Sequence, residues 1–316
     1  MAKAKRGNAV GVIGLGSMGF GVARTLLNKG YNVYAYDVRP QVLRDFARKG
    51  GKPCSTPGEV GANSPVLIVL VVSADQTADA LLGRNGAAVR MAPGSVVIAS
   101  ATVPPAFAEE LGARLANMGL HMIDAPVSGG AARAASGQLS IMASGDREAF
   151  TRARRVLNTI AAKVYRLGDV PGMGSKVKMI NQLLAGVHIA ASAEAMALGI
   201  RAGVDPNVLY EVICNSAGSS WMFQNRVPHI LAGDYTPLSA VNIFIKDLGI
   251  VVDSARSLTF PVPLTSSAHQ VFIMAGAHGH GLEDDSAVVK VFQTVCGIPL
   301  PEKRRVSKPR AARRKR

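Results

Sequence analysis

The sequence predicts an α/β protein with two domains, a parallel-sheet domain at the N-terminal side and an all-α domain at the C-terminal side, joined by a long helix. Two observations predict this fold class. Buried strand patterns alternate with helix patterns through the first half of the chain, which is typical of a parallel sheet with helices on both faces. Beyond residue 172 the pattern is helical, without a convincing strand as far as about Phe292.

The predicted strands are short apolar runs rich in β-branched residues. They are expected at residues 9–15, 31–36, 66–72, 95–99, 121–125, 139–143 and 164–167. The predicted helices in this half have apolar residues at helical spacing. They are expected from the turn after the first strand through Leu27, and at 43–49, 107–118 and 147–160.

The domain boundary is expected at residues 168–174, GDVPGMG, because glycine and proline cluster there. We therefore expect an N-terminal extension (1–8), a sheet domain (9–171), a helical substrate and oligomerisation domain (172–300) and a basic, disordered tail (301–316). The long helix, about 175–203, is nearly uncharged and rich in small residues, which favours packing against a second copy of the chain.

Composition indicates a folded protein of a reducing compartment. Hydrophobic residues make up 48% of the chain and charged residues 18%, which argues against general disorder. The three cysteines form no CxxC pair, which suggests neither a disulfide framework nor a thiolate zinc site. The basic N-terminus precedes too short an apolar run for export. Residues 183–200 approach membrane-spanning length, but they include His188 and Glu194, so a buried helix and a cytoplasmic protein are expected.

The positive charge is concentrated in the tail. The net charge is +15, and the last 14 residues hold nine Lys or Arg and no acid. Such a segment could contact nucleic acid or be a solvated extension, and short basic termini favour the second interpretation. A dinucleotide-binding module without catalysis, docked to nucleic acid by this tail, is the alternative of another functional class.

The first strand leads into a glycine-rich turn that opens a helix, Gly14-Leu15-Gly16-Ser17-Met18-Gly19. Asp37 follows the second strand, 18 residues past the third glycine. This is the arrangement of a Rossmann-type dinucleotide-binding domain, in which the pyrophosphate lies on the helix N-terminus and the acid binds the adenosine ribose. Asp37 favours NAD, because a 2′-phosphate would meet a carboxylate. Arg39 could instead accept that phosphate, so NADP stays an alternative.

Two further stretches carry polar groups to places where ligands bind. Ser128, Gly129 and Gly130 follow the strand at 121–125, where their hydroxyl and backbone N–H groups could seat a carboxylate, although an ordinary turn is equally consistent. Lys178 begins the long helix, and helical spacing places Asn181 and Gln182 on its face.

Lys178 is the expected proton-transfer group. A buried lysine is costly unless it is paired or neutral. As the base that accepts an alcohol proton, it needs a pKa lowered from about 10.4 toward roughly 7–8. A solvated lysine is the plainer interpretation, and it suits Lys176 better.

Three other features allow plain explanations. Lys246 could form an exposed ion pair or reach the same cleft as Lys178. Trp221 and its neighbours could line a pocket or fill the core. His278 and His280 lack a third fixed ligand in the sequence, so no metal site is expected.

Six motifs in order resemble the β-hydroxyacid dehydrogenase family over residues 9–295. They are GLGSMG, Thr102 in ATVPP, DAPVSGG, GMGSKVKMINQ, IKDLG and EDDSAV. The resemblance implies a general acid/base role for Lys178, cofactor contacts for Thr102 and Lys246, and a carboxylate seat at Ser128, Gly129 and Gly130.

The resemblance also implies an activity, the NAD(P)-dependent oxidation of a small hydroxy acid. Later segments such as GHGLEDDSAVVKVF are most similar to a branch that acts on a four-carbon sugar acid. Oxidation of 3-hydroxyisobutyrate or D-erythronate, or interconversion of tartronate semialdehyde and glycerate, are the alternatives. Many relatives carry asparagine where this chain has Gln182, so either Asn181 or Gln182 could contact the substrate. The basic tail has no counterpart in the family pattern.

Overall fold

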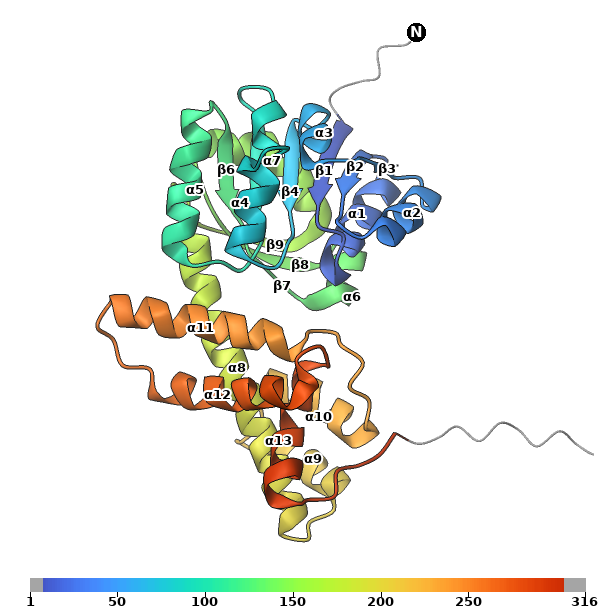
Figure 1. Cartoon of the computed structure of the whole chain (residues 1–316), viewed down its shortest axis with the longest axis vertical. Helices are drawn as coiled ribbons and strands as arrows, with labels where there is room; N and C mark the ends of the chain where they lie inside the picture. The colour runs from blue at the N-terminus through green and yellow to red at the C-terminus, as the bar shows by residue number, and fades with distance from the viewer. Residues whose placement is uncertain (1–7, 304–316) are drawn as a thin grey trace, which may run out of the picture. The chain divides into compact units, whose positions relative to one another are not determined.

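A computed structural model describes residues 8–303, and these residues form two compact units. The first unit runs to Leu183 and includes Asp247–Val262. The second comprises Leu184–Lys246 and the chain from Pro263 onward. The first unit contains a sheet covered by helices and the second is helical, as the sequence predicts (Figure 1).

The sheet of the first unit has nine strands among the described residues, in the order β3-β2-β1-β4-β5-β6-β8-β7, with β9 also paired to β8. The strands are β1 (Ala9–Ile13), β2 (Asn32–Tyr36), β3 (Lys52–Pro53), β4 (Val66–Val69), β5 (Val96–Ala99), β6 (His121–Asp124), β7 (Val127–Ser128), β8 (Leu139–Ser144) and β9 (Ala161–Gly168). The order of the first six strands is the doubly wound arrangement of dinucleotide-binding domains.

The sheet is parallel where strands and helices alternate, as the sequence predicts, and mixed in its last part. Strands β1 to β6 pair in parallel, but β8 is antiparallel to both β6 and β7. Only residues 129–138 connect β7 to β8, which is shorter than the dozen or more residues that a parallel crossover needs. Strand β9 then returns parallel to β8 after a full helix.

Helices cover both faces of this sheet. They are α1 (Ser17–Asn28), α2 (Pro40–Arg48), α3 (Pro57–Ala62), α4 (Ala74–Leu82), η2 (Ala88–Arg90), α5 (Pro105–Asn117), α6 (Gly130–Ser136) and α7 (Arg147–Ile160). The sequence interpretation missed α3, α4 and α6. The first and last of these are only six and seven residues long, too short to show a helical period.

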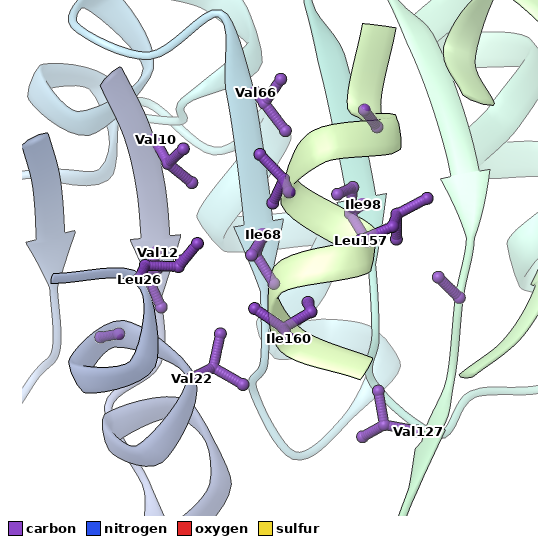
Figure 2. Close-up of a cluster of buried hydrophobic side chains, with 14 of the residues drawn as sticks. Val10, Val12, Val22, Leu26, Val66, Ile68, Ile98, Val127, Leu157 and Ile160 are labelled. Carbon is purple, nitrogen blue, oxygen red and sulfur yellow. The ribbon is translucent and has the colours of Figure 1, made fainter. Parts of the chain in front are cut away.

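Alternate strand residues supply two separate cores. Val66 and Ile68 of β4 face one side of the sheet, while Leu67 and Val69 face the other, as the two-residue period of a strand requires. Figure 2 shows the first core, where side chains of α1 and α7 meet those of β1, β4 and β5. Burial on both faces explains why these strands are uninterrupted apolar runs.

The remaining helices are longer and lie wholly or partly in the second unit. They are α8 (Met173–Arg201), α9 (Pro206–Cys214), α10 (Trp221–Ala232), α11 (Val241–Ser257), α12 (Pro263–Ala275), η3 (Gly276–His280), η4 (Asp285–Val289) and α13 (Lys290–Cys296). Helices α8 and α11 each contribute residues to both units. By length and composition alone, α8 could also cross a membrane, with 39% of its most apolar window buried within the described chain.

Candidate active site

The glycine turn between β1 and α1 is shaped by its backbone. Gly14 has a φ of 90°, and a Cβ there would lie 2.5 Å from the Leu70 carbonyl oxygen. A Cβ on Gly19 would lie 1.9 Å from the Gly14 carbonyl oxygen. Both positions therefore exclude any larger residue. A Cβ on Gly16, in contrast, would meet nothing within 4 Å.

The open space at Gly16 fits a dinucleotide pyrophosphate. Gly16 is the N-cap of α1 and gives its first turn no side-chain hydrogen bond. The first N–H groups of a helix need outside partners, and phosphate oxygens are suited to this place. The residues present thus fit the cofactor that the sequence predicts.

Asp37 lies directly after β2 and is 7% exposed. Its Oδ2 accepts the Leu15 backbone N–H at 2.7 Å and Arg39 Nη2 at 3.0 Å, and its Oδ1 accepts Arg39 Nε at 2.8 Å and the Arg39 backbone N–H at 2.9 Å. Burial alone would raise the pKa of Asp37, but these hydrogen bonds hold it below the ordinary value. The carboxylate is therefore ionised and fixed against the glycine turn.

The parallel strands bring the predicted cofactor residues to one edge of the sheet. Strands β1, β2, β5 and β6 point the same way, so Gly14, Asp37, Thr102 and Asp124 lie at or just beyond their carboxyl ends. Ligands of open α/β sheets bind at this edge. Thr102, predicted as a cofactor contact, lies three residues past β5 and is partly buried.

Asp124 ties this edge to the start of α8. Its Oδ2 accepts the backbone N–H groups of Gly172 at 3.0 Å and Ser175 at 2.8 Å, and its Oδ1 accepts the Ser175 hydroxyl at 2.7 Å. The Ser144 hydroxyl accepts the Gly174 N–H at 3.0 Å. The side chains of Asp124 and Ser144 thus satisfy N–H groups that the start of a helix leaves without intrahelical partners.

Burial raises the pKa of Asp124, although its hydrogen bonds partly oppose that shift. Sequence reasoning did not assign this residue a role. The only local signal was its place in DAPVSGG, and its partners lie 48 and 51 residues further along the chain.

Lys178 lies on α8, three residues after Ser175, and is 7% exposed. Gln182, one turn further on, is also buried. Its Nε2 donates to Asp247 Oδ2 at 2.6 Å, and its Oε1 accepts Asn181 Nδ2 at 3.0 Å. Lys176, on another face, forms an ion pair with Glu109 at 2.8 Å with about half of each side chain exposed. The two lysines therefore differ in surroundings, and only Lys178 is enclosed.

Asp247 follows Lys246, for which the sequence allowed an exposed ion pair. Asp247 itself is not exposed: it lies on α11, is 2% exposed and accepts a hydrogen bond from Gln182. Lys246, its neighbour, is partly buried and belongs to the second unit. No local pattern could show that α11 supplies a carboxylate to the face of α8 that carries Lys178.

Ser128, Gly129 and Gly130 form the end of β7 and the start of α6. Ser128 pairs with Ser140 of β8. Gly129 and Gly130 have φ values of 130° and 69°, which only glycine adopts readily. A Cβ on Gly130 would meet nothing within 4 Å. The backbone of Gly130 is therefore open, whereas a Cβ on Gly129 would lie 2.8 Å from the Arg133 side chain.

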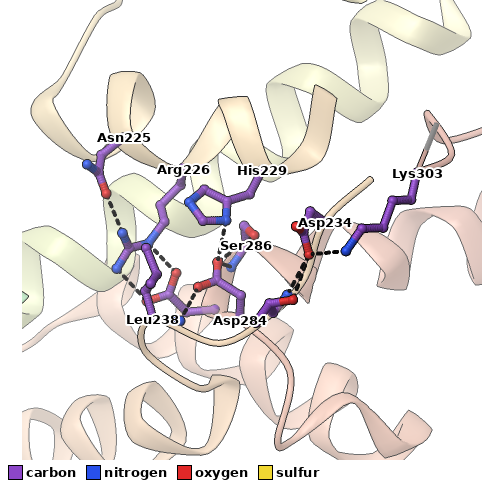
Figure 3. A network of polar contacts seen from close by, with 10 residues as sticks. Asn225, Arg226, His229, Asp234, Leu238, Asp284, Ser286 and Lys303 are labelled. Atoms are coloured by element: carbon purple, nitrogen blue, oxygen red, sulfur yellow. Dashed lines mark hydrogen bonds and ion pairs between the residues drawn. The ribbon is translucent and has the colours of Figure 1, made fainter. Parts of the chain in front are cut away.

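The EDDSAV motif has a structural explanation in the second unit, shown in Figure 3. Asp284 is fully buried and accepts the Leu238 N–H at 3.0 Å and the Ser286 hydroxyl at 2.6 Å. Asp285, equally buried, forms an ion pair with Arg226. Burial raises the pKa of Asp285 to about 6 in spite of Arg226.

The other residues considered in the sequence belong to the second unit. Trp221 begins α10 and is 63% exposed, whereas its neighbours Met222 and Phe223 are buried, so core packing holds for these two and not for Trp221. His280 Nδ1 lies 3.0 Å from Glu283 Oε1, and no cluster of three or more candidate metal ligands occurs in residues 8–303. Apart from residues 301–303, the basic tail and its predicted disorder lie outside the described residues, as does most of the N-terminal extension.

Comparison with known proteins agrees with this geometry. Residues 9–168 match the family model for the NAD-binding domain of 6-phosphogluconate dehydrogenase, and residues 172–292 match that for the NAD-binding of NADP-dependent 3-hydroxyisobutyrate dehydrogenase. The chain is 65% identical to L-threonate dehydrogenase of Cupriavidus necator over 93% of its own length and 98% of that protein.

Solved structures show the same fold. A 3-hydroxyisobutyrate dehydrogenase from Salmonella typhimurium is 49% identical, with a TM-score of 0.85 over 90% of this chain and 99% of that one. The protein Psf3, solved in complex with NADP+ and 2-OPP, is 26% identical with a TM-score of 0.82 over 89% of this chain and 99% of that one.

Proposed function

Since the chain belongs to the β-hydroxyacid dehydrogenase family, and is thus an NAD(P)-dependent oxidoreductase acting on CH–OH groups, we propose that it oxidises L-threonate to 2-oxo-tetronate with NAD. The observation that carries the chemistry is the buried Lys178 beside two side-chain amides on α8. The observation that carries the substrate is the 65% identity to an L-threonate dehydrogenase.

The glycine turn and Asp37 are the proposed cofactor site. The backbone from Gly14 to Gly19, including Leu15, Ser17 and Met18, cradles the pyrophosphate. Asp37 binds the adenosine ribose, and Thr102 and Lys246 contact the remainder of the cofactor. When bound, the nicotinamide ring accepts a hydride from the substrate carbon.

Lys178 is the proposed general base. It takes the proton of the substrate alcohol in the oxidative direction and returns it in the reverse direction. Asp124 fixes the helical turn from which the buried Lys178 projects. Ser128 and the N–H groups of Gly129 and Gly130 hold the substrate carboxylate, which sets the carbon presented for oxidation.

Asn181 and Gln182 are the proposed partners of the additional substrate hydroxyls. In the free protein the two amides bond to each other, and Gln182 also bonds to Asp247, so substrate hydroxyls take the donor and acceptor positions that these bonds leave over. A hydroxyl-rich acid uses more of these positions than 3-hydroxyisobutyrate, which carries a methyl group. The 49% identity to a structure titled 3-hydroxyisobutyrate dehydrogenase keeps that acid as the second candidate.

A substrate panel tests this assignment. Purified protein is assayed for cofactor reduction with L-threonate, D-erythronate, 3-hydroxyisobutyrate and glycerate, each with NAD and with NADP. We expect the highest kcat/KM with L-threonate and NAD. A higher value with 3-hydroxyisobutyrate would overturn the substrate assignment.

Replacement of Lys178 tests the mechanism. Lys178→Ala should lower kcat by about 10²–10⁴-fold, the usual contribution of general acid–base catalysis, and leave NAD affinity within about twofold. Lys176→Ala is the matched control on the same helix and should retain wild-type turnover. Full turnover by Lys178→Ala would remove this residue from the mechanism.

We also infer a cytoplasmic homo-oligomer. Large apolar side chains are exposed on several helices of the second unit: Leu184, Leu198, Val208, Val212, Trp221 and Leu264. Exposed apolar area of this kind is typical of an interface. Helix α8 carries Glu194 within its apolar stretch, which favours protein over lipid as its partner. Mass measurement in solution without detergent tests the oligomeric state, and a monodisperse monomer would contradict it.

A further inference from the structure

Arg39 occupies the acceptor positions of Asp37 that a ribose would need. An ionised carboxylate has about four lone-pair sites. In this protein one accepts the Leu15 N–H, one the Arg39 backbone N–H and two the Arg39 side chain. A ribose hydroxyl can therefore donate to Asp37 only after a contact from the Arg39 guanidinium is released.

The same guanidinium also reaches the glycine turn. Arg39 Nη2 donates to the Leu15 carbonyl oxygen at 3.2 Å. Arg39 thus bridges the end of β2 and the turn that follows β1. Its side chain is still 56% exposed, so it has space to move outward without disturbing the core.

We propose that Arg39 is a cofactor-selecting residue, which closes the ribose site of the free protein, competes with NAD for Asp37 and turns to the 2′-phosphate when NADP binds. With NAD, the displaced guanidinium loses its charged partner. With NADP, it exchanges a carboxylate for a phosphate, another anion that suits its planar fork. The inference rests on the proposed cofactor site and extends it: the choice between NAD and NADP is set by the pair Asp37–Arg39 rather than by Asp37 alone.

Local electrostatics supports the exchange. A 2′-phosphate beside an unpaired Asp37 would be repelled, and Arg39 supplies the charge that offsets this repulsion. The hydrogen bonds and charge of Asp37 raise the pKa of Arg39 in the free protein, and an arginine guanidinium stays charged after it leaves such a partner. NADP binding is therefore weakened less by Asp37 than the carboxylate alone would predict.

The decisive variant is Arg39→Ala, because it keeps the backbone N–H that orients Asp37 and removes only the competing side chain. Calorimetric titration with NAD and with NADP, without substrate, gives both dissociation constants. We expect NAD to bind about two- to tenfold more tightly than to the wild type and NADP to bind at least tenfold more weakly. The opposite signs distinguish competition from a general loss of binding.

Two further measurements sharpen the test. Adenosine 5′-monophosphate and adenosine 2′,5′-bisphosphate, titrated in the same way, separate the 2′-phosphate from the nicotinamide half, and only the bisphosphate should bind Arg39→Ala more weakly. Arg48→Ala, on α2 in an ion pair with Asp45, is the matched control and should leave all affinities unchanged.

If Arg39→Ala weakens the binding of NAD and NADP equally, Arg39 supports the adenosine site. If it changes neither affinity, Arg39 has no role in cofactor binding. Either result overturns the proposal. Because the titrations need no turnover, they are independent of the substrate. Absence of L-threonate oxidation would contradict the proposed function and leave this inference standing.

Discussion

The attachment of α8 to Asp124 gives the sharpest prediction about this site. Asp124→Ala removes the acceptor of the Gly172 and Ser175 backbone N–H groups, whereas Asp124→Asn keeps an oxygen that can accept both, since both bonds go to Oδ2. The Asn amide can then donate to the Ser175 hydroxyl, which at present donates to Oδ1. The two variants thus separate the geometry that Asp124 provides from its charge.

The expected cost follows from the groups left without partners. Each buried donor that loses its acceptor costs about 1–3 kcal/mol, and Asp124→Ala leaves two backbone donors in this state. Burial of the Asp124 carboxylate is itself unfavourable, as its raised pKa indicates, so its removal offsets part of that loss of stability. We therefore expect Asp124→Ala to be destabilised by about 2–4 kcal/mol and Asp124→Asn by about 1 kcal/mol or less.

Urea unfolding and steady-state kinetics measure the two effects. Asp124→Ala should also lose kcat, because the turn that carries Lys178 is released, while Asp124→Asn should keep most of it. A loss of kcat in Asp124→Asn as large as that of Lys178→Ala, with stability intact, would refute the positioning role and indicate a carboxylate needed for the chemistry.

The pH dependence of stability has a defined sign. The pKa of Asp124 in the folded protein lies above its ordinary value near 3.8, so its contribution to stability is full below that value and is lost as the pH rises through the folded pKa. Wild type should therefore lose stability relative to Asp124→Asn as the pH rises from about 4. The reverse trend in urea unfolding would contradict the assignment.

Two other predictions concern the glycine turn and the buried ion pair. Gly19→Ala places a Cβ 1.9 Å from the Gly14 carbonyl oxygen and should destabilise the fold by about 3 kcal/mol in thermal or urea unfolding. Gly16→Ala meets nothing within 4 Å and should keep its stability yet bind NAD more weakly by calorimetry; equal stability of the two variants would contradict the steric argument. Arg226→Met leaves Asp285 buried without its ion-pair partner and should cost about 3–5 kcal/mol. Because the folded-state pKa of Asp285 is about 6 with Arg226 present and rises further without it, the loss should be larger at pH 8 than at pH 5, and a loss independent of pH would contradict this account.

The sequence by itself determined the features whose causes are local. Strand and helix periods identify the alternating half of the chain. The three glycines and Asp37 predict the dinucleotide site, because each acts within one turn or at one strand end. Lys178 shares a helix face with Asn181 and Gln182, which predicts that it is buried, and the structure buries it. Its catalytic role stays a proposal.

Only the tertiary structure decided which distant groups complete the site. Asp124 bonds the start of α8, about 50 residues further along the chain, and Asp247 bonds Gln182, 65 residues away. Arg39 bonds the Leu15 carbonyl oxygen, 24 residues away, while it also holds Asp37. The antiparallel β8 belongs to the same class of feature. A periodic pattern specifies which face of an element is buried, but the hydrogen-bond partner of a buried polar group depends on which elements pack there, and that is settled when the whole chain folds.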